Sequence, residues 1–161
     1  MTADEKRAAI DAFEKGGDAF DDVLTLSPAV LTYRPFPDAW TIHEHVVHSL
    51  EVDVATFHRY RRAVAQPETP VLAFDQKWTP ALNYHTHDLD ATVTLIKLLR
   101  RYMAAHLRTL TDRDWTKLAY IHSTLGRVDL ERAIVSYIDH VRFHRELIDR
   151  NLRLWGKNSQ P

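Results

Sequence analysis

The chain has 161 residues, 45% of them hydrophobic and 27% charged, and its formal net charge is -1. This ordinary globular balance predicts one domain over residues 1–161, with no strong attraction to nucleic acid and no membrane-spanning segment. The chain has no cysteine, which excludes disulfides, thiolate metal ligands and a cysteine nucleophile. Because the N-terminus lacks the apolar core of a signal peptide, a cytoplasmic location is expected.

The first predicted helix runs from Ala3 to about Leu26. Thr2 and Glu5 have the spacing of a capping box at its start. Gly16 and Gly17 interrupt this helix, and they reduce its stability while allowing a neighbouring backbone to come close.

The second predicted helix starts at Thr41 and ends near Gln66-Pro67. Thr41 and Glu44 make another capping box, so Glu44 is expected to be a cap partner rather than a metal ligand. Residues 67–87 then form a connection with three prolines and several bulky apolar residues. Such a connection is expected to pack over an end of the helices.

The third predicted helix spans about 88–110, and a second connection covers residues 111–128. The fourth helix runs from Asp129 to Trp155 and is expected to end at Gly156, because glycine is common just beyond helix C-termini. Four amphipathic helices with long second and third connections predict an all-α fold, a four-helix bundle with long crossover connections.

Two of the ten histidines, His140 and His144, lie one helical turn apart in the fourth helix. This spacing points both imidazoles to the same side of the helix, which gives half of a metal site. His48, on the second helix, is the best candidate for a third ligand, and His45 could share its face. The alternative is that these are core histidines hydrogen-bonded to backbone or to a buried acid.

Several other kinds of site are excluded by spacing. The segment from His43 to His48 resembles a zinc-protease helix, but that motif needs histidines four apart around a glutamate, and position 47 is valine. A di-iron bundle needs repeats of Glu-x-x-His, which the chain lacks. The serines lack the Gly-x-Ser-x-Gly elbow of a hydrolase triad, and four glycines make a phosphate loop or dinucleotide fingerprint improbable.

A family resemblance covers about residues 4–155. It is carried by Trp40-Thr41 followed by His48, by the segment 70–75 (Pro-Val-Leu-Ala-Phe-Asp), by 122–126 (His-Ser-Thr-Leu-Gly), and by His140-x-x-x-His144. In this order and spacing the residues resemble the DinB-like superfamily, in particular its branch of YfiT-like metal-dependent hydrolases.

The resemblance implies a four-helix bundle that is often a homodimer. It also implies a divalent metal ion, zinc or nickel, bound by His48, His140 and His144. Some relatives use the metal to activate a low-molecular-weight thiol, such as bacillithiol or mycothiol, for transfer, and others are called hydrolases. The family name implies no DNA binding. Because these activities act on small molecules, the resemblance implies a small-molecule substrate as the partner.

Two classes of function stay open at this point. One is a metal-dependent enzyme, a thiol S-transferase or a hydrolase, in which three neutral imidazoles leave a metal position open for a thiol or water. The other is a non-enzymatic bundle with a structural or vestigial metal site that acts through dimerisation or partner binding. Asp139, Tyr137 and Glu51 are candidates for orienting the imidazoles.

Overall fold

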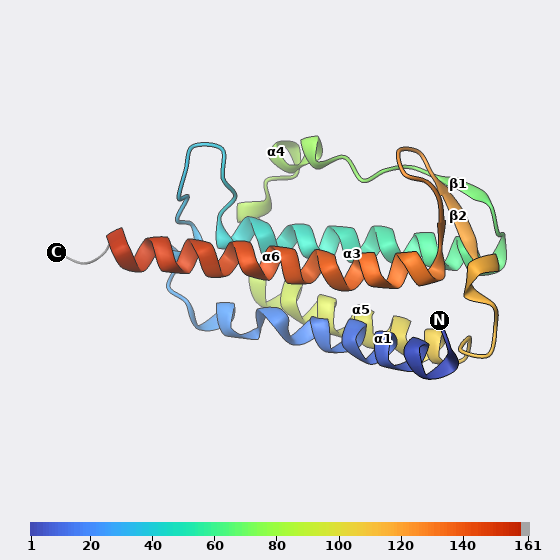
Figure 1. Ribbon diagram of the computed structural model, residues 1–161. Helices are drawn as coiled ribbons and strands as arrows, with labels where there is room; N and C mark the ends of the chain where they lie inside the picture. Colours follow the sequence, from blue (N-terminus) through green and yellow to red (C-terminus); the bar gives the residue numbers. More distant parts are fainter. Residues whose placement is uncertain (159–161) are drawn as a thin grey trace.

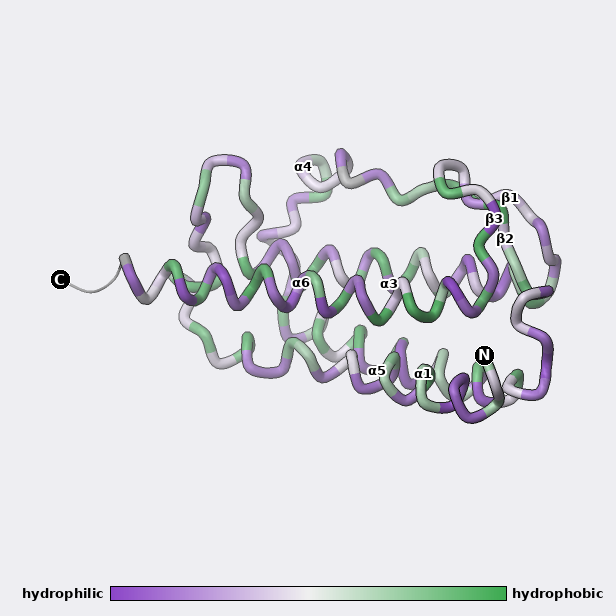
Figure 2. Tube along the Cα trace, viewed as in Figure 1, coloured by the Kyte–Doolittle hydropathy of each residue, from purple (hydrophilic) through white to green (hydrophobic). Residues whose placement is uncertain are grey.

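The structure is a computed structural model that describes residues 1–158. Within them, four long helical segments form an elongated bundle, in which α3 (Ile42–Ala65) and α6 (Leu130–Asn158) run beside α1 (Ala3–Lys15) and α5 (Leu89–Arg108) (Figure 1). Hydrophobic and hydrophilic residues alternate along these helices, as expected when each buries one face (Figure 2). The predicted fold class, a four-helix bundle with long crossovers, is confirmed.

The first helix changes its geometry at the two glycines. After α1 the chain continues as a 3₁₀ helix, η1 (Gly16–Thr25), rather than as the single α-helix that the sequence predicted. The glycines do allow close approach to α5: a Cβ on Gly17 would lie 3.2 Å from the Cα of Lys97, and one on Gly16 would lie 2.7 Å from Nη1 of Arg100. A short helix, α2 (Pro28–Leu31), precedes the loop to α3.

The helix ends follow the predicted caps with one exception. Both capping boxes, Thr2 with Glu5 and Thr41 with Glu44, are present, and the side chain of Asp88 caps α5. The prediction that Gly156 ends the last helix is wrong, because α6 extends to Asn158. Gly126, at the start of a short strand, is the only glycine of the described residues with positive φ, so Gly156 does not form a left-handed cap.

The two long connections contain a small sheet that the sequence reasoning did not predict. Strand β1 (Thr69–Val71) pairs in parallel with β2 (Ala119–His122), and β2 pairs antiparallel with β3 (Gly126–Asp129). The first connection also contains η2 (Gln76–Trp78), α4 (Thr79–Leu82) and η3 (Tyr84–Thr86), and the second contains η4 (Trp115–Lys117). The first connection therefore runs along one side of the bundle, not only over its end (Figure 1).

Two apolar clusters form the core, and a buried ion pair separates them. One cluster includes Phe13, Met103 and Trp115 near the sheet, and the other includes residues such as Phe20 and Ile148. Between them Arg100 contacts Asp53 through Nε at 2.6 Å and Nη2 at 2.7 Å, and their side chains are only 1% and 2% exposed. The same guanidinium donates to the carbonyl oxygen of Phe13 at 3.0 Å, which ties α5, α3 and α1 together.

In residues 1–158 we find no helix with both the length and the apolar character needed to cross a lipid bilayer.

Candidate metal centre

The three histidines singled out by the sequence converge in the structure. His48 from α3 meets His140 and His144 from α6, and one ligand atom from each lies within 4.8 Å of the others. His48 and His144 are buried, with 1% and 3% of their surface exposed, and His140 is partly buried. The ring centroid of His48 lies 5.3 Å from that of His140 and 4.8 Å from that of His144. The helical spacing and the α3–α6 packing together produce this cluster.

Further rings pack against the cluster: Trp40 contacts two of the three histidines, and His45 contacts one of them. Trp40, just before α3, stacks on His144 at 6.1 Å and contacts His48 edge-on at 4.7 Å. Asn151 donates to the carbonyl oxygen of Trp40 at 2.8 Å and so holds the backbone of Trp40 against α6. His45 shares the face of His48, as its spacing suggested, and its Nδ1 lies 3.0 Å from Nδ1 of His144.

The contact between His45 and His144 has a consequence for the tautomers. Nδ1 of one ring must donate a hydrogen and Nδ1 of the other must accept it. If His144 donates, its Nε2 is left with a free lone pair, which is the state that a metal ligand requires. His45 therefore has the position of an outer residue that orients a ligand. Its spacing from His48 predicts the shared face, but nothing in the sequence indicates this role.

Several buried ring nitrogens of the cluster have no hydrogen-bond partner. These atoms are both nitrogens of His48, Nε2 of His45 and Nδ1 of His140. A buried polar atom without a partner costs free energy, so native proteins almost always satisfy such atoms. A divalent cation between His48, His140 and His144 would be the missing partner for ring nitrogens of this cluster. The residues present thus fit a metal.

Burial keeps all four imidazoles neutral. It lowers the pKa of His48 to about 3 and that of His144 to about 2, and it lowers the pKa values of His45 and His140 to about 4. The proximity of the rings to one another adds to the effect for His48 and His144. Neutral imidazole is the form that binds metal ions, so the cluster is in the binding form at neutral pH.

These lowered pKa values predict acid sensitivity of the metal-free protein. Below pH 6.5 the histidines of the unfolded chain become protonated, while those of the folded cluster stay neutral. Protons therefore favour the unfolded state, and the free energy of unfolding is highest above pH 6.5 and decreases as the pH falls. We expect the free energy of unfolding, measured with urea, to decrease by about 1–2 kcal/mol per cluster histidine between pH 7 and pH 5. The variant His48→Phe should lose less than the wild type over this range, and an equal loss would contradict the prediction.

Other histidines and the predicted orienting residues lie outside the cluster. His43 contacts the carbonyl oxygen of His87 at 3.0 Å, and His106 contacts the Tyr60 hydroxyl at 3.2 Å. Asp139 pairs with Arg142 at the surface, 2.9 Å away.

Tyr137 pairs its hydroxyl with that of Tyr120 at 3.2 Å. No contact between Glu51 and the triad is found among the described residues. The orienting contact to His144 comes instead from His45.

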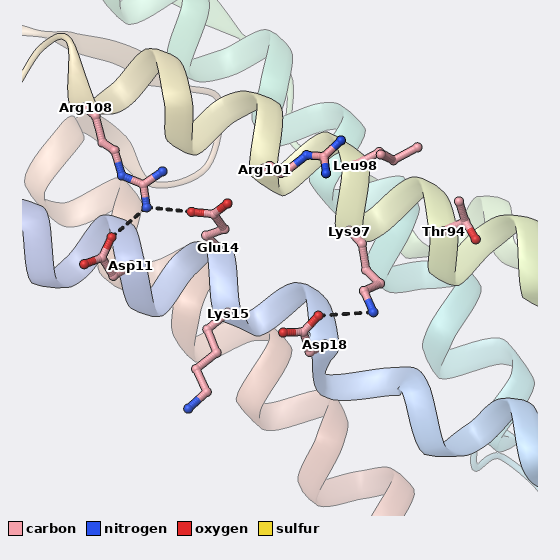
Figure 3. A pocket seen from close by; sticks show the side chains of 9 residues that line it. All are labelled: Asp11, Glu14, Lys15, Asp18, Thr94, Lys97, Leu98, Arg101 and Arg108. Atoms are coloured by element: carbon pink, nitrogen blue, oxygen red, sulfur yellow. Dashed lines mark hydrogen bonds and ion pairs between the residues drawn. The ribbon is translucent and has the colours of Figure 1, made fainter.

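A larger hollow, with a volume of about 760 Å³, lies away from the histidines, between α1 and α5 (Figure 3). Most of its charged side chains pair with one another. Arg108 contacts both Asp11 and Glu14 at 2.6 Å, and Lys97 contacts Asp18 at 3.2 Å. Because these exposed pairs neutralise each other, the hollow is a solvated seam between helices rather than a candidate site.

Comparison with known proteins gives matches of both sequence and fold. The family model of the DinB superfamily matches residues 12–148. YfiT of Bacillus subtilis (strain 168), a candidate metal-dependent hydrolase, is 26% identical over 124 residues, which cover 76% of this chain and 68% of YfiT. The solved structure of YfiT from Bacillus subtilis, described as an unusual four-helix bundle, superposes with a TM-score of 0.87 at 24% identity. That superposition covers 97% of this chain and 90% of the YfiT chain.

Proposed function

Because this chain belongs to the DinB superfamily, we propose that it is a metal-dependent enzyme acting on a small molecule, with His48, His140 and His144 as the metal ligands. The observation that carries the proposal is the state of His48. Its side chain is buried, yet neither ring nitrogen has a hydrogen-bond partner. A purely structural core histidine would be expected to use at least one of them.

The chemistry follows from three neutral ligands. When bound, a divalent cation lowers the pKa of a water or thiol that it contacts, toward about 7 for water on zinc, which makes either one a nucleophile at neutral pH. The chain's own residues prepare this site. His45 and Trp40 fix the ring of His144, and burial keeps protons off the ligand nitrogens.

The similarity to YfiT, a candidate metal-dependent hydrolase, supports hydrolysis as the reaction. Transfer of a low-molecular-weight thiol is the second form of the same proposal. It rests on the preference of a metal centre for thiolates and on the family resemblance. Zinc and nickel are the ions that we propose, since both bind imidazole nitrogen well.

A non-enzymatic role is the alternative, and one surface feature favours association. An apolar groove of about 690 Å³ lies between α3 and α5, and Val54, Leu95 and Tyr102 on it are more than half exposed. Exposed apolar patches of this kind often mark interaction sites. We propose that a second copy covers it to form a homodimer. Sedimentation showing only monomer at high concentration would contradict this.

The metal proposal is tested with protein purified without a histidine tag. After metal removal, titration with Co²⁺ is expected to give a single bound ion per chain with visible absorption bands. Azide or 2-mercaptoethanol should change those bands, because an open position accepts a further ligand.

Failure to bind Co²⁺, Zn²⁺ or Ni²⁺ stoichiometrically would contradict the proposal. Bands that do not respond to either added ligand, together with a sharp fall in melting temperature on metal removal, would favour the structural alternative.

A further inference from the structure

A small cavity of about 220 Å³ opens beside the histidine triad, between α3 and α6. Two triad residues, His48 and His140, line it. Its other lining residues are Val52, Thr56, Arg59, Phe74, Ser136 and Tyr137. Those on α3 follow His48 at intervals of three or four residues, so they lie on the same face of that helix. The cavity therefore lies directly against two of the three triad residues.

The charge of this cavity is positive. No aspartate or glutamate is among its lining residues, the imidazoles are neutral, and Arg59 carries the charge. Arg59 donates to the carbonyl oxygen of Leu72 at 3.1 Å, so its guanidinium lies against the first connection, residues 67–87. A guanidinium has five N–H donors in a fork that matches an oxyanion, and Leu72 takes one of them. The cavity therefore favours an anionic ligand.

Two hydroxyl groups near Arg59 add hydrogen-bond donors. The Thr56 side chain is fully buried, and its hydroxyl, next to that of Tyr137, lacks a well-formed hydrogen bond. The Tyr137 hydroxyl contacts that of Tyr120 at 3.2 Å, and burial raises the pKa of Tyr137 well above its ordinary value. Tyr137 thus stays protonated at neutral pH, and a hydroxyl can donate to a bound oxygen.

The distance between Arg59 and the triad sets the shape of the ligand. Arg59 follows His48 by eleven residues, which is a rise of about 16 Å along α3. Helical side chains lean toward the N-terminus, so the long arginine side chain reaches back over part of this length. A ligand that spans the remainder must have its anionic group several bonds from the atom at the triad.

We propose that the substrate is small, elongated and anionic, and that Arg59 binds its carboxylate or phosphate group while its other end lies at the triad. Phe74 and Val52 contact the apolar part between the two ends. Arg59 is then the residue that determines specificity. This inference rests on the proposed function, because it assigns the substrate class of the same site.

Binding of simple probes to the metal-free protein tests the inference. Hexanoate and hexyl phosphate have an anionic end and an apolar chain, and 1-hexanol has the same chain without the charge. By calorimetry or by the NMR signal of the Arg59 side chain, at least one anion is expected to bind about tenfold more tightly than hexanol. Which of the two binds more tightly distinguishes a carboxylate from a phosphate substrate.

Variants of Arg59 test whether this residue causes the preference for anions over hexanol. Arg59→Gln should abolish it, and Arg59→Lys should retain only part, because lysine keeps the charge but not the fork. Arg62→Gln is the matched control: Arg62 lies one turn further on α3, contacts Gln66 at 2.8 Å, and does not line the cavity. This variant should bind the anions like the wild type.

Three results would overturn the inference: equal binding of hexanol and both anions, an undiminished preference in Arg59→Gln, or no binding of any probe at millimolar concentration. Because the protein is metal-free here, these outcomes are independent of the Co²⁺ titration. A protein that binds Co²⁺ but shows no preference for anions would retain the proposed function and lose only this inference.

Discussion

Replacing His144 with alanine is expected to weaken zinc or nickel binding by more than about 100-fold. Loss of an outer residue that only orients a ligand typically costs 10–100-fold in metal affinity, and removal of a ligand should cost more. His144 is 3% exposed and lies within ligand distance of both His48 and His140. The measurement is competition with a chelator of known affinity, after circular dichroism has shown that the variant is folded.

Two further variants make this test specific. His45→Phe keeps the three proposed ligands but removes the contact to His144, so we expect a smaller loss, about 10–100-fold. His106→Ala changes a histidine that contacts Tyr60 outside the cluster, and its metal affinity should equal that of the wild type. Full metal affinity in His144→Ala would exclude His144 as a ligand.

Replacing Asp53 with asparagine is expected to destabilise the fold by about 3–5 kcal/mol. Asparagine leaves the guanidinium of Arg100, whose side chain is 1% exposed, without a counter-charge between the two apolar clusters. An uncompensated buried charge is far more costly than the loss of one hydrogen bond. Urea unfolding of the metal-free protein at neutral pH measures the difference.

The control is an exposed ion pair in the same bundle. Asp11 contacts Arg108 at 2.6 Å, but its side chain is 67% exposed, so Asp11→Asn should change stability by no more than about 1 kcal/mol. The double variant Asp53→Leu with Arg100→Met should recover much of the loss, because it removes both charges. A change below about 1 kcal/mol in Asp53→Asn would contradict the role assigned to this pair.

The helices and the histidine pair on α6 were predictable because local periodicity encodes them. Apolar residues at helical spacing predicted the long helices, and His140 and His144 lie on one face of α6 by that same spacing. His48 belongs to another helix, so only the bundle fold and the family resemblance connected it to the pair. The meeting of His48 with this pair results from tertiary packing of two helices, which we could expect only from the family resemblance.

What the sequence did not reveal depends on contacts between distant residues. Arg100 and Asp53 are 47 positions apart, and each one alone has the appearance of an ordinary charged residue on a helix. The contact from His45 to His144 spans 99 positions. The strands are three or four residues long, too short for a period-two pattern, although Tyr120 and Ile121 before a Ser-Thr-Leu-Gly turn were a usable signal.

Anomalous diffraction from crystals of the zinc-loaded protein, recorded at the zinc edge, shows whether the three histidines bind one metal ion. We expect a strong peak about 2.0–2.1 Å from one ring nitrogen each of His48, His140 and His144, with a fourth position open toward the cavity that Arg59 lines. A peak bound by other residues, or rings of the triad without a metal ion between them at saturating zinc, would contradict it.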